Sequence, residues 1–108
     1  MPYFDGEAAL RALADPRRRQ ILNLAWDREQ SPSGLARDCQ LSRPAMSQHL
    51  KVLREADLIS VRLEGNRRFY RARADRLAEL RALLDDFWGS RLTSLGAAME
   101  APGQETRR

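Results

Sequence analysis

The chain lacks several features that mark whole classes of protein. It has a single cysteine, Cys39, so one chain cannot form an internal disulfide or supply the four thiolates of a structural zinc site. It has no run of 18 apolar residues, which argues against a transmembrane helix. Its first ten residues include Asp5 and Glu7 and no basic start before an apolar stretch, unlike a secretory signal. We therefore expect a cytoplasmic protein in a reducing compartment, without membrane association.

Residues that carry catalysis are also scarce. His49 is the one histidine, and the sequence shows no Gly-rich phosphate loop and no nucleophile–base pair. The adjacent carboxylates Asp85 and Asp86 point about 100° apart on a helix, which is typical of surface charges. We expect no enzyme activity and no cofactor.

The basic residues are concentrated in one third of the chain. The 108 residues suit one domain, 1–108, and carry 19 basic and 15 acidic side chains. Residues 42–73 hold eight of the basic and only three of the acidic side chains. A local field of this kind favours a polyanionic partner, although a genome rich in arginine codons would also raise the total.

Helix start signals divide the first half of the chain. Asp15-Pro16 and Ser31-Pro32 each place an N-cap before a proline suited to the first helical turn, and Ser42 is a third N-cap. They predict helices at 7–14, 16–27, 32–38 and 43–56. In the last of these, Met46, Leu50 and Leu53 form a core stripe.

The periodicity then changes. Residues 58–63 alternate apolar and polar side chains, residues 64–66 have turn chemistry, and residues 67–73 include two aromatics, so the pattern predicts a β-hairpin. A last helix is predicted at 75–99. Its long apolar stripe exceeds what a short domain buries alone, and we expect another chain to cover part of it.

Together these elements predict a mostly α fold with a small β-hairpin, a winged helix-turn-helix. The helix-turn-helix spans about 31–56 and the wing about 59–73. A helix fits the DNA major groove, and the outward residues near its start contact base edges, while a basic hairpin tip suits the backbone or minor groove. The predicted DNA-binding residues are Ser42, Arg43, Ala45, Ser47, Gln48, Lys51, Asn66, Arg67 and Arg68.

Three segments make the pattern specific. Residues 13–22, 41–58 and 64–71, above all the run Ser47-Gln-His-Leu-Lys-Val-Leu-Arg-Glu-Ala56, resemble the ArsR/SmtB family of bacterial winged-helix repressors. The resemblance implies a homodimer formed by the first and last helices, binding to a palindromic operator, and release by an inducer. The residues it implies for the dimer interface are Leu10, Leu77, Leu80, Leu84, Phe87, Trp88, Leu92 and Leu95.

The chain departs from the metal-sensing patterns of that family. Many relatives place cysteines on the helix before the recognition helix, or histidines and carboxylates on the last helix. Here residues 31–38 contain neither Cys nor His, and the last helix offers four carboxylates without a histidine. Carboxylates alone make a poor site for zinc, nickel or arsenic, so we expect no metal site.

Several residues have more than one interpretation. Cys39 is either a buried small residue or a redox switch, and His49 has a structural or phosphate-adjacent role. Residues 17–19, three arginines, either touch the DNA backbone or form a solvated helix face. Four aromatics (Trp26, Tyr70, Phe87 and Trp88) are either core or the lining of a small-molecule effector pocket at the dimer interface. The alternative to DNA binding is a protein-interaction module.

Overall fold

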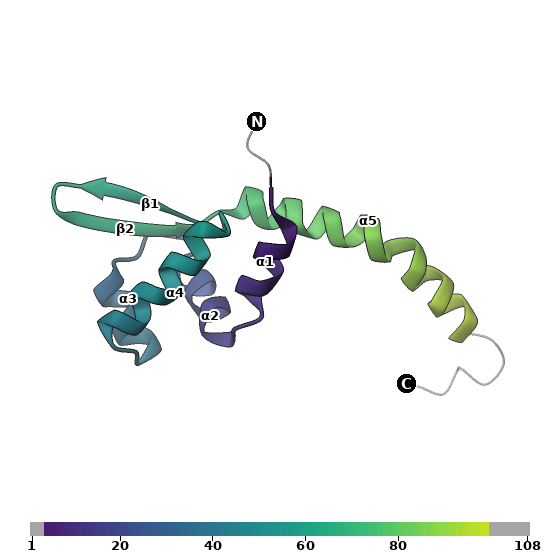
Figure 1. Cartoon of the computed structure of the whole chain (residues 1–108), viewed down its shortest axis with the longest axis horizontal. Coiled ribbons are helices and arrows are strands. Elements are labelled where there is room, and N and C mark those ends of the chain that lie inside the picture. The colour runs from purple at the N-terminus through teal and green to yellow at the C-terminus, as the bar shows by residue number, and fades with distance from the viewer. Residues whose placement is uncertain (1–3, 100–108) are drawn as a thin grey trace.

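The computed structural model describes residues 4–99 of the chain, with the side chains of 4–89 and of Arg91. In this part, the order of elements is α1 (Gly6–Leu13), α2 (Pro16–Leu24), α3 (Pro32–Cys39), α4 (Arg43–Glu55), β1 (Ile59–Glu64), β2 (Arg67–Ala72) and α5 (Ala74–Met99). This confirms the predicted winged-helix order. Helices α1 to α4 form a body, the hairpin extends from one end of it, and α5 crosses α1 and continues past it (Figure 1).

The helix starts are capped as the sequence indicates. The side chains of Asp15, Ser31 and Ser42 accept hydrogen bonds from backbone N–H groups in the first turns of α2, α3 and α4, at 2.7, 3.0 and 3.2 Å. Asp5 caps α1 in the same way, at 3.0 Å, so this helix begins at Gly6, one residue earlier than predicted. These caps satisfy N–H groups at the start of each helix that have no partner within the helix.

Helix α2 ends at Leu24 rather than near Asp27, and this corrects the prediction. The residues after Leu24 bond to the wing instead of continuing the helix. The carbonyl of Ala25 accepts a hydrogen bond from the N–H of Ala72 at 2.9 Å. Gln30 then exchanges two backbone hydrogen bonds of 2.8 Å with Tyr70. The backbone therefore pairs with β2 instead of extending the helix, and Trp26 is left 43% exposed.

The core forms where the four short helices meet the hairpin. Its fully buried large side chains are Ile21, Leu35, Met46, Leu53 and Leu58. Met46, Leu50 and Leu53 are all buried, which confirms the predicted stripe of α4. The opposite side of α4 consequently faces away from the core.

The arginines at 17–19 attach α2 to its neighbours. Arg18 donates to the carbonyls of Ala12 and Arg11, at 2.7 and 3.3 Å, and Arg19 donates to the carbonyl of Leu13 at 2.6 Å. Arg17 donates to the carbonyl of Cys39 at the end of α3. All three satisfy carbonyls at helix ends, which neither sequence reading of this run anticipated.

An ion-pair network joins the end of α4 to the base of the wing and the start of α5. Asp57, at a φ of 65°, pairs with Arg73 at 2.7 Å and with Arg76 at 2.8 Å. Arg76 is only 6% exposed and also pairs with Glu79 at 2.7 Å. The recognition helix, the wing and the last helix are thereby connected through one carboxylate.

Candidate nucleic-acid interface

The outward side of α4 carries the residues predicted to bind DNA. Arg43, Ser47, Gln48 and Lys51 are exposed, as is the N-cap Ser42, whereas Ala45 is half-buried. The buried stripe of α4 holds this side away from the core, so these polar groups are free to meet a partner.

At the tip of the wing, Asn66, Arg67 and Arg68 are exposed. Gly65, at a φ of 62°, makes the reversal that joins β1 to β2. The antiparallel register pairs Glu64 with Arg67 and Leu63 with Arg68. Although neighbouring residues of a strand point to opposite faces, both arginines line the same groove between the wing and the helices.

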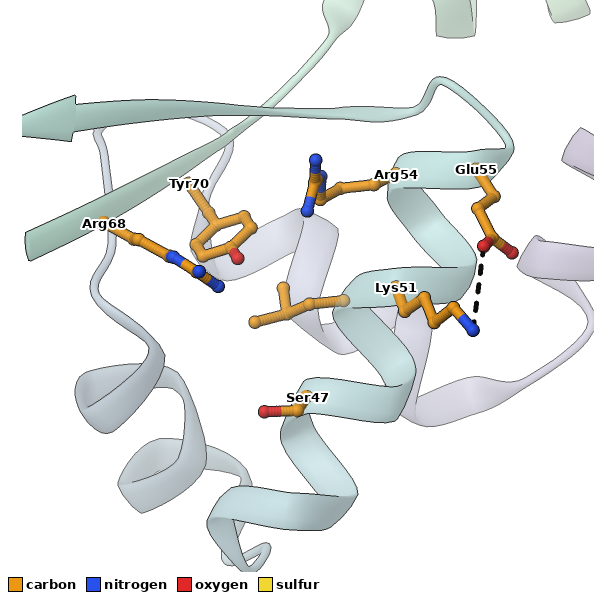
Figure 2. Close-up of a pocket in the computed structure, with 7 residues that line it drawn as sticks. Ser47, Lys51, Arg54, Glu55, Arg68 and Tyr70 are labelled. Atoms are coloured by element: carbon orange, nitrogen blue, oxygen red, sulfur yellow. Dashed lines mark ion pairs between the residues drawn. The ribbon is translucent and has the colours of Figure 1, made fainter.

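Two connected grooves lie between the wing and the helices. One, of about 440 Å³, is lined by Ser47, Leu50, Lys51, Arg54, Glu55, Arg68 and Tyr70. The other, of about 550 Å³, is lined by Ser31, Pro32, Ser33, Arg43, Ser47, Leu50, Asn66, Arg67, Arg68 and Tyr70. In Figure 2, Arg54 and Arg68 extend from α4 and β2 toward the space between them, while Lys51 turns away toward Glu55.

Ion pairing divides seven of the eight basic residues of 42–73 into two groups, and the eighth, Arg71, donates to the backbone carbonyl of Asp27 at 3.2 Å. Arg62 binds both carboxylate oxygens of Glu29 at 2.8 Å and also Glu64, and Arg73 binds Asp57 and Asp75. Lys51 lies 3.9 Å from Glu55. Within the part of the chain that the structure describes, no carboxylate lies within 4.0 Å of the arginines at 43, 54, 67 and 68. The groove walls therefore hold arginines that an external anion can bind.

The ion pairs of Arg62 change the pKa values of the groups that form them. The hydrogen bonds from Arg62 lower the pKa of Glu29, and those to Glu29 and Glu64 raise the pKa of Arg62. Arg62 and Arg67 both lie over the ring of Phe69, at 4.8 and 5.0 Å from its centre. These contacts hold the wing beside the loop that follows α2.

Sequence reasoning missed two groove residues. Arg54 was counted in the basic block but not assigned to DNA, although it follows Ser47 and Lys51 at the spacing of one helix face. Ser33 was not singled out at all. It receives a hydrogen bond of 2.8 Å from Arg43, a contact between α3 and α4 that no sequence spacing indicates.

Cys39 is buried in the core, and His49 is half-buried beside Arg18. Cys39 is 2% exposed, and burial raises the pKa of its thiol, which disfavours the reactive thiolate. His49 is half-buried, with its Nδ1 atom 3.4 Å from the guanidinium of Arg18. These surroundings favour the buried-residue interpretation of Cys39 and the structural one of His49.

The residues that could line an effector pocket do not gather in one place. Tyr70 is 3% exposed and belongs to the core beneath the wing, as in the alternative that these aromatics are core residues. Phe87 and Trp88 meet edge-to-face on α5, with ring centres 4.8 Å apart.

Among the described residues, no three His, Cys, Asp or Glu side chains lie close enough to hold a metal ion. Nor does any described helix combine the length and apolar character needed to cross a bilayer.

The apolar stripe of α5 is divided between the core and the surface. Leu80 is 3% exposed within its own chain, and Leu77 and Leu84 pack partly against the same core. Phe87 and Trp88 are 51% and 45% exposed, and Leu10 of α1 is 45% exposed. Leu83, which was not predicted, is also 46% exposed. The side chains of Leu92 and Leu95 lie outside those that the structure describes.

Comparisons with known proteins agree with this geometry. Residues 15–61 match the family described as bacterial regulatory protein, arsR family. The chain is 41% identical to the HTH-type transcriptional regulator Rv2034 of Mycobacterium tuberculosis, over 96% of this chain and 97% of the relative. It is 32% identical to the arsenical resistance operon repressor of Staphylococcus xylosus, over 79% of this chain and 82% of that protein.

The fold of the chain is also similar to solved structures of bacterial transcription regulators. The ArsR-like transcriptional regulator from Rhodococcus sp. RHA1 superposes with a TM-score of 0.75 at 27% identity, covering 90% of this chain and 92% of that one. A structure described as a possible transcriptional regulator for arsenical resistance has a TM-score of 0.69 at 44% identity, covering 82% and 93%.

Proposed function

This chain belongs to the arsR family of bacterial regulatory proteins, DNA-binding transcription regulators that are not enzymes, and from that premise we propose that it is a dimeric repressor acting in the cytoplasm. Its target is a palindromic operator in double-stranded DNA. Helix α4 lies in the major groove, and the wing contacts the backbone or the minor groove.

One observation carries the proposal: the arginines at 43, 54, 67 and 68, which have no carboxylate within 4.0 Å among the described residues, line the grooves between α4 and the wing. Phosphate contacts by such residues supply much of the affinity of DNA-binding proteins and make it dependent on salt. The exposed Ser47, Gln48 and Lys51 on α4 provide donors and acceptors for base edges. A helix used to dock another protein would present apolar groups here, so the polarity of α4 favours DNA over the protein-interaction alternative.

The exposed apolar side chains of α1 and α5 support the homodimer. Four of them are each more than 40% exposed: Leu10, Leu83, Phe87 and Trp88. Packing against a second copy of the chain would bury this apolar surface and stabilise the dimer. A twofold dimer places two α4 helices for half-sites about one DNA turn, roughly 34 Å, apart. Two half-sites related by symmetry form the palindrome.

Fluorescence anisotropy with DNA from just upstream of the gene tests the proposal, with scrambled DNA of equal length as control. We expect selective binding that weakens steeply between two salt concentrations. Gln48→Ala is expected to relax the preference at one base pair by about 1–3 kcal/mol. Equal weak binding to both DNAs, followed by no enrichment in a selection from random sequences, would contradict the repressor function.

The same titration tests the two effector modes. Because the Cys39 thiol is buried and its pKa is raised, we expect binding to survive treatment with diamide. Loss of binding that a reductant reverses, and that Cys39→Ala abolishes, would instead identify a redox switch. If oxidation has no effect, the remaining effector mode is a small-molecule inducer, to be sought by screening for compounds that release the DNA.

A further inference from the structure

Arg43 is held differently from the other exposed arginines beside the recognition helix. It is the first residue of α4, and its Nη1 atom donates to the hydroxyl oxygen of Ser33 in α3, at 2.8 Å. This contact directs the guanidinium sideways toward α3. Since the hydroxyl oxygen of Ser33 accepts this bond, its own hydrogen remains available to a second acceptor.

The groove beside this pair offers donors and no carboxylate. Residues of α3 and its N-cap form one wall, Arg43 and Ser47 of α4 a second, and Asn66, Arg67 and Arg68 of the wing a third. None of its lining residues is acidic. Arg43 and Arg68 approach from different elements, an arrangement that suits an oxygen-rich anion between them.

The position of α3 indicates which anion this is. In helix-turn-helix proteins the helix before the recognition helix crosses the DNA backbone, while the recognition helix meets the base edges. Figure 1 shows α3 beside α4 beneath the hairpin. Ser33 lies in the first turn of α3, the helix that this docking mode puts on the backbone side of the interface. A group tied to Ser33 is therefore closer to a strand than to the groove floor.

We propose that Ser33, Arg43 and Arg68 hold one phosphate of the DNA backbone in this groove, which rests on the proposed function. Arg43 is then a phosphate contact that sets the register of α4, not the contact to a base edge that its position near the start of the helix suggested. Base recognition falls to Ser47, Gln48 and Lys51. Affinity for all sequences depends on Arg43, while sequence preference does not.

Phosphate substitution combined with mutation tests this assignment. Single phosphates of the operator are replaced in turn by uncharged methylphosphonates, and binding of the wild type and of Arg43→Ala is measured. We expect one position per half-site whose replacement weakens the wild type strongly and Arg43→Ala much less, because in the variant only Arg68 supplies a positive charge to that phosphate. Arg43→Ala should also weaken binding to operator and scrambled DNA about fivefold per half-site at 0.15 M salt and lower the salt slope by about 0.9 per half-site, the effect of one phosphate contact in each subunit.

Two further variants sharpen the result. Ser33→Ala is expected to reduce the penalty at the same phosphate by a smaller amount, because it removes the alignment of Arg43 but not its charge. Arg81→Ala on α5, an exposed arginine 3.9 Å from Asp85 and outside the grooves, is the matched control and should leave the phosphate profile unchanged.

The possible failures are distinct. An altered preference at one base pair with an unchanged salt slope would overturn the phosphate assignment and make Arg43 a base reader. Equal penalties in wild type and Arg43→Ala at every phosphate would also overturn it. If the wild type itself shows no selective, salt-dependent binding, the proposed function fails together with the inference.

Discussion

Two runs of adjacent arginines have opposite roles in this molecule. Residues 17–19 turn back onto the protein and donate to carbonyls at the ends of α1 and α3. Arg67 and Arg68, at the tip of the wing, lie beside the grooves without a carboxylate partner among the described residues. The difference follows from their neighbours: a helix end leaves carbonyls unpaired, whereas the antiparallel ladder of the hairpin satisfies its own backbone.

The comparison predicts that arginines bound within the chain contribute to stability and that unpaired arginines contribute to DNA binding. Measuring both properties for each variant tests it. Unfolding in urea reports the first property, and the salt dependence of DNA binding reports the second.

The largest expected effect is on stability, in Arg76→Ala. This side chain is 6% exposed, and its removal leaves Asp57 with Arg73 alone and Glu79 without its partner. We expect a loss of about 2–3 kcal/mol in the free energy of unfolding. A urea midpoint equal to that of the wild type would show that the network is not a structural junction.

Next is the double variant Arg67→Ala/Arg68→Ala. Loss of two phosphate contacts in each subunit predicts about 30-fold weaker binding per half-site at 0.15 M salt and a salt slope lower by about 1.8 per half-site. The free energy of unfolding should change by less than about 0.5 kcal/mol, since both side chains are exposed. An unchanged slope would remove the wing from the DNA interface.

Arg18→Ala is expected to show the reverse pattern. It removes two hydrogen bonds to carbonyls at the end of α1 and an ion pair with Asp15, so we expect a loss of about 1.5 kcal/mol in stability. Its salt slope should equal that of the wild type. A lower slope with unchanged stability would mean that residues 17–19 reach the DNA after all.

The smallest effect concerns pH. Hydrogen bonds from Arg62 and Arg73 lower the pKa of Glu29 and of Asp75 below their ordinary values of 4.5 and 3.8. Because the folded state binds fewer protons than the unfolded state, this stabilisation is present above about pH 4.5 and is lost as the pH falls further. The urea midpoint should decrease on acidification, less steeply in Glu29→Gln. Identical slopes would mean that the Arg62–Glu29 pair does not contribute.

Most of the architecture was predictable because its signals are local. Each cap at Asp15, Ser31 and Ser42 lies within three residues of the N–H group that it accepts from, and the stripe of α4 follows from helical spacing. The end of α2 was misplaced because Ala72, some 47 residues later in the chain, takes the carbonyl of Ala25. For the same reason, the division of α5 between core and surface required its contact with α1, where Gly6 lies against the side chain of Leu83.

The sequence by itself determined the order of elements, the polar side of α4 and the concentration of basic charge in residues 42–73, since composition and short-range periodicity encode each of them. The tertiary structure decided which basic residues remain available to a partner. Arg62 is paired with Glu29, 33 residues away, whereas Arg67 and Arg68 of the same hairpin have no carboxylate partner among the described residues. Charge is a property of the residue, but whether it is already compensated depends on which carboxylates and carbonyls the fold brings within reach.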